Sequence, residues 1–434
     1  MSSKSGSGKT SKGAAATKPE ADAPEPAEAR KAKKSEAGAA LGSSFKLSSE
    51  QSGKLMRVAG IVAGIGLVLG GAGFASDSKR FAFSYLVGFV WLATIGLGAL
   101  FFVIVQHLVR AGWSVSPRRH LEWLSSGILP ACAVLFVPVA VFAHTLYHHW
   151  MGEHAAHDEL LRKKAAYLNP GFFYGRAVVF LVLWAGISLW FARTSRKQDE
   201  TGDRSLSQKM QLASAPSMLV FGLSLTFAAF DWIMSLTPHW YSTIFGVYVF
   251  AGAATSSLSA LVLVTIALQK AGLLKGVSTV EHRHDIGKLL FGFTVFWAYI
   301  AFSQFILIWY ANLPEETVYY RDRSAGSWMV VSLALLFGHF IIPFLGLIAR
   351  TAKRNITVLA GFAVWMLVMH WLDLYWMIMP TLDVGDAHFS WIDLGGLLLP
   401  AGVGAVAVAR AATGGATYPL KDPRLAESMR LENA

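Results

Sequence analysis

The sequence contains a single cysteine, Cys132, in 434 residues. A disulfide needs two cysteines, a c-type haem is attached through a C-x-x-C-H motif, and an iron–sulfur cluster is held by several thiolates. The chain therefore has no internal disulfide and cannot carry either redox group by itself. We expect it to bind no haem, cluster or metal ion of its own.

Charged residues are also scarce. They make up 15% of the chain, whereas soluble domains have about 25%, and hydrophobic residues make up 54%. The mean hydropathy of +0.45, the 15 Trp and the 28 Phe are typical of a protein whose surface faces lipid. The net charge of +11 does not indicate nucleic-acid binding, because the basic residues lie in the N-terminal segment and in alternate loops. The composition predicts an integral membrane protein.

Long apolar runs follow an N-terminal segment rich in Ala, Lys, Ser, Glu and Pro. Each run is long enough to cross about 30 Å of hydrocarbon as a helix. The runs occupy residues 56–75, 81–108, 121–147, 172–192, 213–235, 241–268, 286–310, 326–350, 355–379 and 389–411. The sequence therefore predicts an all-α integral membrane protein with about ten transmembrane helices. We expect residues 1–50 to form a disordered basic tail, residues 51–412 the transmembrane domain, and residues 413–434 a C-terminal tail.

Lysine and arginine are distributed unevenly among the loops. The loops after the second, fourth, sixth and eighth runs hold far more of them than the other loops, and both terminal segments add to the same side. Basic residues remain on the cytoplasmic side of a membrane. Both termini are therefore predicted to be cytoplasmic. No apolar core follows the first charges of the chain for some fifty residues, so we expect no signal peptide.

Two of the runs share a pattern at their outer ends. Asp231 and Asp373 are each followed seven residues later by a proline, and both have Trp and Met close by. The two runs are four places apart in the series, so both point outward. This repeat predicts two four-helix bundles, over residues 81–235 and 241–379, with the first and last runs as peripheral helices.

Several polar residues fall in the outer third of the membrane when each is placed by its distance from a helix end. An ionisable residue there is costly and marks a functional site by default. His370 and Asp373 are three residues apart and share a helical face, so a proton could pass between them. The candidate proton-transfer residues are Asp231, His370, Asp373 and, nearer mid-membrane, His339. The candidates for supporting hydrogen bonds are Gln304, Tyr299, Tyr248, Arg176 and Asp393.

These residues also allow other interpretations. Both acids, Asp231 and Asp373, could be ion-paired, for instance to Arg176, and only hold helices together. One haem between His339 and His370 is conceivable from their similar depth, but isolated histidines in a membrane more often form hydrogen bonds inside the bundle.

The outer loop over residues 144–164 is rich in histidine. His149, Glu153 and His157 have the spacing i, i+4, i+8, which would place them on one face of a helix and within reach of a metal ion. No established zinc motif is present. We therefore favour an amphipathic helix that lies on the membrane or on a partner.

Three segments resemble a known family. FDWIMSLTPHWYSTIFGVYVFAG (residues 230–252), SQFILIWYANLPEET (303–317) and HWLDLYWMIMP (370–380) closely resemble the F subunit of alternative complex III, a bacterial quinol:cytochrome c oxidoreductase. The resemblance covers roughly residues 50–420. It implies a membrane subunit similar to those of polysulfide and nitrite reductases, with two four-helix bundles and peripheral helices.

The resemblance also implies a location and partners. The chain would lie in the bacterial inner membrane beside a paralogous membrane subunit, an iron–sulfur subunit, cytochrome c subunits and, in some complexes, a terminal oxidase. Haem c and iron–sulfur clusters would belong to those partners, and quinol is the one small molecule that this chain would contact. The supporting residues above then become candidates for quinone contact as well.

Three functions compete on this evidence. The first is a redox-complex subunit with quinone contact, proton transfer or both near the periplasmic side. The second is a secondary transporter, which the repeat and the intramembrane acids suggest. The third is a structural membrane anchor of a redox complex, whose polar layer only packs against its paralogue.

Overall fold

The computed structural model describes residues 45–413 and 415–432. Throughout this part the chain is helical and contains no β-strand. Ten helices are long and apolar enough to cross a membrane, which confirms the predicted all-α, multi-pass membrane fold. The predicted tail lies outside the described residues except at its end. There the prediction was a few residues too long, because Phe45 is buried and the first helix begins at Ser49.

The ten spans and the short elements between them follow the chain in order. The spans are α2 (Ser49–Ser76), α3 (Ser78–Leu108), α4 (Val115–Val141), α8 (Pro170–Thr201), α9 (Ser205–Trp232), α10 (Phe245–Lys270), α11 (Val280–Ala311), α13 (Trp328–Ala334) with η3 (Leu335–Ile341) and α14 (Ile342–Ile348), α16 (Ile356–Ile378) and α17 (Trp391–Thr413). The short elements are α5 (Ala143–Leu146), α6 (His148–Met151), η1 (Glu153–Ala156), α7 (Glu159–Lys164), η2 (Met234–Leu236), α12 (Pro314–Asp322), α15 (Arg350–Arg354), η4 (Met379–Thr381) and α18 (Leu425–Met429).

Local sequence explains where several spans begin. Asn169 caps α8 by accepting a hydrogen bond from the Phe172 amide at 2.9 Å, and Pro170 occupies the first helical position, where no amide hydrogen is needed. Asn355 caps α16 in the same way. The α8 helix ends at Gly202, whose φ of 72° is the left-handed conformation that glycine adopts without strain.

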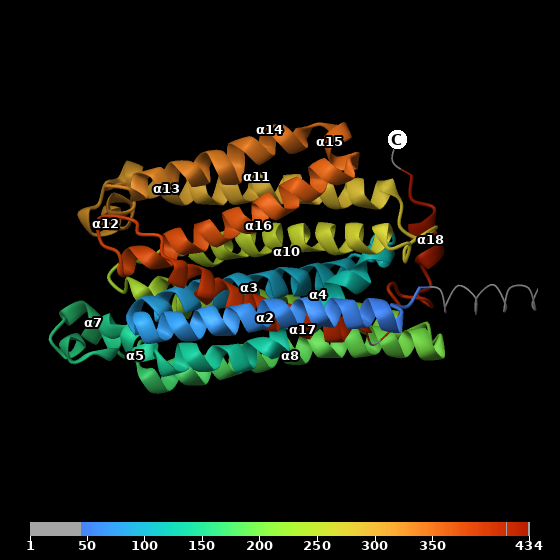
Figure 1. Cartoon of the computed structure of the whole chain (residues 1–434). Helices are drawn as coiled ribbons and strands as arrows, with labels where there is room; N and C mark the ends of the chain where they lie inside the picture. The colour runs from blue at the N-terminus through green and yellow to red at the C-terminus, as the bar shows by residue number, and fades with distance from the viewer. Residues whose placement is uncertain (1–44, 414, 433–434) are drawn as a thin grey trace, which may run out of the picture. The chain divides into compact units, whose positions relative to one another are not determined.

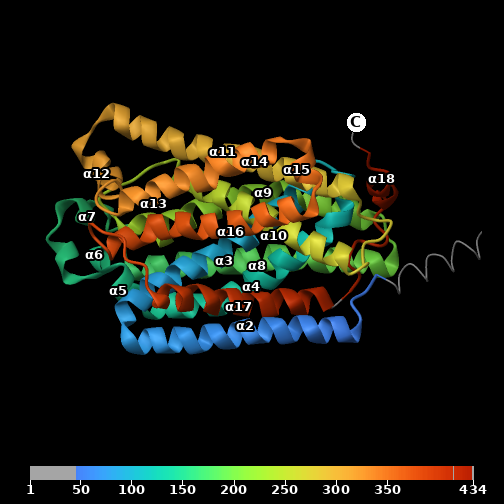
Figure 2. The same ribbon diagram turned by 45° about the horizontal axis from the view of Figure 1, so that its top comes forward.

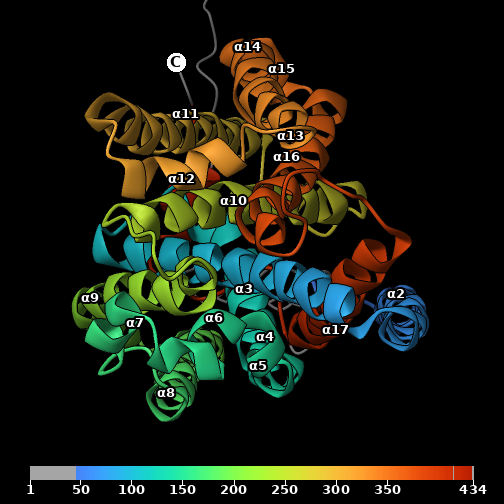
Figure 3. The ribbon, with the colours of Figure 1, turned by 90° about the vertical axis from the view of Figure 1, so that its left-hand side faces the viewer.

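The helices form two groups of four, as predicted. One group is α3, α4, α8 and α9, and the other is α10, α11, α16 and the span formed by α13, η3 and α14. We call them the first and the second bundle. Viewed along the helices, α3 and α10 lie centrally and contact each other across the boundary (Figure 3). We call the end that carries α7 and α12 the α12 end, and the end that carries α15 and α18 the α18 end (Figure 1).

The α2 and α17 helices lie side by side at the edge of the first bundle (Figures 2 and 3). They approach closely through glycine. A Cβ atom on Gly66 would lie 2.5 Å from the backbone of Leu398, and one on Gly402 would lie 2.4 Å from Ala63. The glycine-rich first run therefore packs through small residues, in the manner common between membrane helices.

The C-terminal segment packs against the α18 end of the bundles. The Thr417 amide donates to the carbonyl of Phe45 at 3.0 Å, and Asp422 forms a buried ion pair with Arg118. Ser428 is fully buried and donates to the carbonyl of Trp113 at 2.8 Å. The predicted C-terminal tail is thus part of the folded structure over its described residues.

Candidate functional site

The first of the two matched acids is ion-paired. Asp231, at the α12 end of α9, is 1% exposed. Arg176 from α8 reaches both of its oxygens, with Nε 2.7 Å from Oδ2 and Nη2 2.9 Å from Oδ1. The remaining Nη1 donates to the Tyr167 carbonyl at 3.0 Å, and the guanidinium lies 4.1 Å from the centre of the Phe172 ring. This two-point pair matches the structural alternative for Asp231 and connects α8 to α9.

The second acid has neutral partners. Asp373 on α16 is also 1% exposed. The hydroxyl of Tyr248 on α10 donates to Oδ1, and the indole Nε1 of Trp297 on α11 donates to Oδ2 at 3.1 Å. Among the residues that the structure describes, Asp373 makes no ion pair. Its charge is therefore balanced by hydrogen bonds alone, which is the environment of an acid that can exchange a proton.

His370 lies one helical turn from Asp373, as the sequence spacing predicts. Its Nε2 is 2.8 Å from Oγ1 of Thr94 on α3. The Thr94 hydroxyl also reaches the Val90 carbonyl at 2.8 Å. Thr94 can therefore donate to that carbonyl and accept from the imidazole, which leaves Nδ1 of His370 as the unprotonated nitrogen.

That Nδ1 atom is buried and has no hydrogen-bond partner among the residues that the structure describes. It lies against the backbone of Gly252 on α10. A Cβ on Gly252 would be 2.9 Å from Nδ1 of His370 and 3.9 Å from Oδ2 of Asp373. The missing side chain of Gly252 therefore leaves room for both groups on the same side of α10.

His339 completes the polar group. It is fully buried, neither ring nitrogen has a partner, and its ring centre lies 3.8 Å from that of Trp297. It sits in η3, a π-helical segment, which leaves a carbonyl free at Gly338. The Trp365 indole donates to this carbonyl at 2.7 Å. Segments of π-helix are frequent at functional sites.

A cavity of about 500 Å³ adjoins Asp373 between α11, α12, α13 with η3, and α16. Its lining residues are mostly apolar or aromatic: Tyr248, Trp297, Ala298, Ala301, Phe302, Phe305, Tyr320, Ser324, Met329, Ser332, Leu333, Leu335, Leu336, Phe340 and Trp376. Phe302 is 60% exposed and Leu336 47%, so the cavity opens on the membrane-facing surface. Tyr248 and Trp297, both donors to Asp373, form part of its wall, and the volume suits a small-molecule ligand.

Gln304 supports this wall indirectly. Its side-chain nitrogen donates to the Tyr320 hydroxyl at 2.9 Å, and its oxygen accepts from Ser242 at 2.9 Å. Tyr299, by contrast, is 65% exposed and does not line the cavity. The structure therefore brings Gln304 to the site through Tyr320 and places Tyr299 on the outer surface of α11.

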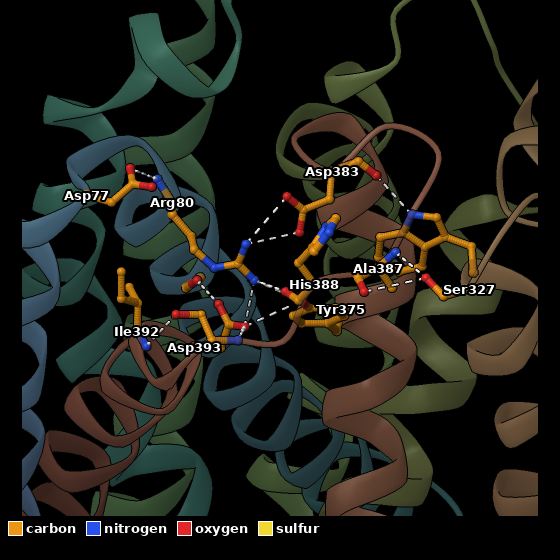
Figure 4. A network of polar contacts seen from close by, with 12 residues as sticks. Asp77, Arg80, Ser327, Tyr375, Asp383, Ala387, His388, Ile392 and Asp393 are labelled. Atoms are coloured by element: carbon orange, nitrogen blue, oxygen red, sulfur yellow. Dashed lines mark hydrogen bonds and ion pairs between the residues drawn. The ribbon is translucent and has the colours of Figure 1, made fainter.

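Asp393 belongs to a separate network at the α12 end (Figure 4). Arg80 at the start of α3 pairs with Asp393 at 2.9 Å and with Asp383 at 3.1 Å, and it donates to the His388 carbonyl. Ser84 donates to Asp393 at 2.5 Å. These contacts join α3 to α17 and to the loop after α16, so Asp393 is a structural residue rather than part of the cavity.

The His-rich loop does not form the expected helix. Residues 144–164 are divided among α5, α6, η1 and α7, so the face predicted for His149, Glu153 and His157 does not exist. No group of three or more His, Cys, Asp or Glu within the described ranges could hold a metal ion. Instead, Asp158 contacts His239 at 2.6 Å, and the hydrogen bond from His239 lowers the pKa of Asp158.

A haem between His339 and His370 does not fit this arrangement. Nε2 of His370 is engaged by Thr94, and Nδ1 faces the backbone of Gly252. The His339 ring packs against Trp297 at 3.8 Å between ring centres. An axial ligand needs a ring nitrogen that points at the iron, and His370 has none available.

No protein-family model matches this chain, and no curated protein matches it.

Proposed function

We propose that this chain is an integral-membrane subunit of a quinol:cytochrome c oxidoreductase of the alternative complex III type, in which the second bundle binds a quinol headgroup and accepts its proton. The observation that carries the proposal is the contact between the cavity wall and Asp373. Tyr248 and Trp297 line the cavity and donate to the two oxygens of that buried carboxyl. A headgroup in the cavity is thus one side chain away from a proton acceptor.

The shape of the cavity supports a quinol more than a polar solute. Its wall is aromatic and aliphatic, and its opening faces the lipid between α11 and η3. A prenylated ring is itself dissolved in the bilayer and can enter from the side. A secondary transporter needs a path that opens to water on alternate sides of the membrane. The mostly apolar and aromatic lining of the cavity does not favour such a path.

Proton transfer at this site balances simply. One quinol hydroxyl gives its proton to the Asp373 carboxylate, directly or through Tyr248; once Asp373 has passed that proton on, it accepts the proton of the second hydroxyl, and the two electrons leave to a partner subunit. Nδ1 of His370, the nitrogen that Thr94 does not contact, takes the proton onward from Asp373. His339 lies on the other side of Trp297 and extends the polar group towards mid-membrane.

In this proposal the α12 end is periplasmic and the α18 end cytoplasmic, as the Lys and Arg distribution predicts. The membrane is the bacterial inner membrane. The paralogous membrane subunit, the iron–sulfur subunit, the cytochrome c subunits and, in some complexes, a terminal oxidase are the proposed partners, and the iron–sulfur clusters and haems c are theirs. Reporter fusions test the orientation: a fusion at Gly276 should report cytoplasm and one at Pro238 periplasm.

The contacts of the first bundle support a structural role for that part of the chain. Its acid, Asp231, is paired with Arg176, and Asp393 is paired with Arg80. Both pairs join helices and neither lines the cavity. We infer that the first bundle with α2 and α17 acts as a membrane anchor, while the second bundle carries the chemistry.

The proposal is tested with a substitution that fills the cavity. Ala301 lines it, and Ala301→Phe should reduce the binding of a short-chain naphthoquinone to the purified chain by tenfold or more, measured by quenching of tryptophan fluorescence. Ala133 lines an open groove between α4 and α8 and provides the matched control, because Ala133→Phe adds the same ring to the first bundle. Equal quinone affinity in the two variants would refute the proposed site.

A further inference from the structure

Arg323 is a buried arginine whose hydrogen bonds all go to backbone carbonyls. It follows α12 directly and is 2% exposed. Its Nε donates to the Trp376 carbonyl at 3.0 Å, Nη2 to the Met377 carbonyl at 2.8 Å and Nη1 to the Tyr319 carbonyl at 2.9 Å. The first two carbonyls are at the C-terminal end of α16, so part of the role of Arg323 is to cap that helix.

Capping leaves the full charge of Arg323 without a counter-ion. In the described part of the chain, the arginines that are buried to a similar extent each form an ion pair with a carboxylate: Arg80, Arg118, Arg119 and Arg176. Arg323 forms none there, and the neighbouring Asp322 pairs with Arg321 at 3.6 Å. A buried charge with no opposite charge is costly unless something else compensates it.

The charge of Arg323 lies just behind the cavity wall. Ser324, the next residue, lines the cavity, and so does Trp376, whose ring centre is 5.2 Å from the guanidinium carbon. Asp373 precedes Trp376 by three residues, which is about 5 Å along a helix axis. The cation therefore lies close to the cavity, at the end of the helix that carries Asp373.

We propose that Arg323 is a positioning residue that makes the cavity selective for a headgroup that carries, or acquires, a negative charge: a quinolate or an acidic hydroxyquinone. This inference rests on the proposed function. When a quinol gives its proton to the Asp373 carboxylate, the negative charge moves from the carboxylate to the quinol oxygen. Arg323 lies just behind the cavity wall, so its positive charge offsets the negative charge that the quinol oxygen acquires.

The experiment compares an anionic with a neutral ligand of the same shape. The probes are 2-hydroxy-1,4-naphthoquinone, which is an anion at neutral pH, and 1,4-naphthoquinone. Binding to the full purified chain in detergent is measured by tryptophan quenching. A unit charge at about 8 to 10 Å in an effective dielectric of about 20 changes the affinity for an anion by about tenfold or more.

Two pairs of variants isolate the charge. Arg323→Gln should weaken binding of the anion by about tenfold and leave the neutral quinone within about twofold, whereas Arg323→Lys should retain the preference for the anion. Ser324→Asp keeps Arg323 and its carbonyl contacts but adds an opposing charge, and it should reduce anion binding to a similar extent. Ser324→Asn makes the same change in size without the charge, so the effect of the charge is the ratio of anion affinity to neutral-quinone affinity in Ser324→Asp relative to that ratio in Ser324→Asn. If Arg323→Gln fails to fold, the Ser324 pair decides the question.

The outcomes separate this inference from the proposed function. If both quinones bind the unsubstituted chain and neither Arg323→Gln nor Ser324→Asp changes their ratio, Arg323 only caps α16 and the inference is overturned while the quinone site stands. If neither quinone binds the unsubstituted chain, the proposed function fails and the inference fails with it. The expected result is that Arg323→Gln and Ser324→Asp both weaken binding of the anionic quinone and retain binding of the neutral one.

Discussion

The two matched acids of this protein look alike in sequence and differ in their surroundings. Asp231 and Asp373 each end a span, each precede a proline by seven residues, and each are 1% exposed. An arginine side chain donates to both oxygens of Asp231, whereas a phenol and an indole donate to the oxygens of Asp373. A carboxylate paired in this way is held ionised, but one with neutral donors can gain and lose a proton.

The neighbouring surfaces differ in the same sense. Between α4 and α8 of the first bundle lies an open groove of about 460 Å³, whose lining includes Ala133, Val137 and Val178 but neither Asp231 nor Arg176. The corresponding space of the second bundle, between α11 and α13 with η3, is the cavity that reaches the donors of Asp373. The two bundles thus share an architecture but differ around the acid. In the first bundle an arginine pairs with Asp231, and in the second a cavity reaches the donors of Asp373.

The largest expected effect is on turnover. Asp373→Asn keeps the shape of the side chain and removes its titratable proton, so quinol:cytochrome c turnover of the assembled complex should fall by about a hundredfold or more, as for loss of a general base. Asp231→Asn should leave turnover within about threefold, because an ion-paired residue is not a proton acceptor in this scheme. Subunit content, measured on gels, must stay normal in both. Full turnover in Asp373→Asn would remove the distinction between the two acids.

The next effect is on stability and concerns the first bundle. Arg176→Gln leaves a buried carboxylate without its partner and should destabilise the folded chain by about 3 kcal/mol, as for other broken buried pairs. Adding Asp231→Asn should recover much of that loss, since no charge then remains unpaired. Thermal unfolding in detergent measures both variants. A double variant no more stable than Arg176→Gln alone would show that the pair does not act as a unit.

Most of the fold was predictable and the contacts of the site were not. Long apolar runs are decided by local composition, so the ten spans and both bundles follow from the sequence. Which polar groups meet depends on how helices far apart in the chain pack, and no spacing rule places Thr94 beside His370 or Trp297 beside Asp373. Tyr299 is an example: it lies at the depth of the site, but its side chain is on the exposed face of α11 and does not line the cavity.

Two further features of the structure, the π-helical segment η3 and the burial of Arg323, could not be predicted from the sequence pattern. The π-helical turn at η3 shifts the helical register, and His339 lies within it, so α-helical periodicity does not predict which way His339 faces. Arg323 follows a short helix in a loop, where an arginine would ordinarily be solvated. Only the fold shows that it is buried against the end of α16. Arg176, by contrast, was available from depth alone as an ion-pair partner for the two acids, but depth does not tell which of them it contacts; the structure pairs it with Asp231.

A smaller effect should distinguish the donors to Asp373 from ordinary tyrosines. Tyr248→Phe removes the hydroxyl that donates to Oδ1 and should lower turnover by about fivefold to tenfold, the value of one buried hydrogen bond. Tyr174→Phe is the matched control, because that hydroxyl donates to the Ala140 carbonyl at 3.2 Å in the first bundle. Equal turnover in the two variants would mean that the Tyr248 hydroxyl does not tune Asp373.

The smallest expected effect concerns the loop that covers the α12 end of the first bundle. Lys164 donates to the Pro238 carbonyl at 2.7 Å, and Asp158 contacts His239. The hydrogen bond from His239 lowers the pKa of Asp158 below its ordinary value of 3.8. Because the folded state holds the carboxylate form more strongly, this contact stabilises the loop above about pH 4, and the stabilisation is lost as the pH falls through the lowered pKa.

Hydrogen exchange of residues 152–164 measures this loop directly. Exchange should accelerate modestly as the pH falls below about 4, after correction for the intrinsic rate, and Asp158→Asn should exchange faster at neutral pH with less dependence on pH. Naphthoquinone quenching in the same Asp158→Asn sample should be unchanged, because the cavity belongs to the second bundle. A loss of quinone binding on loosening this loop would instead couple the two bundles, and the contrast between an anchoring and a reactive bundle would no longer hold.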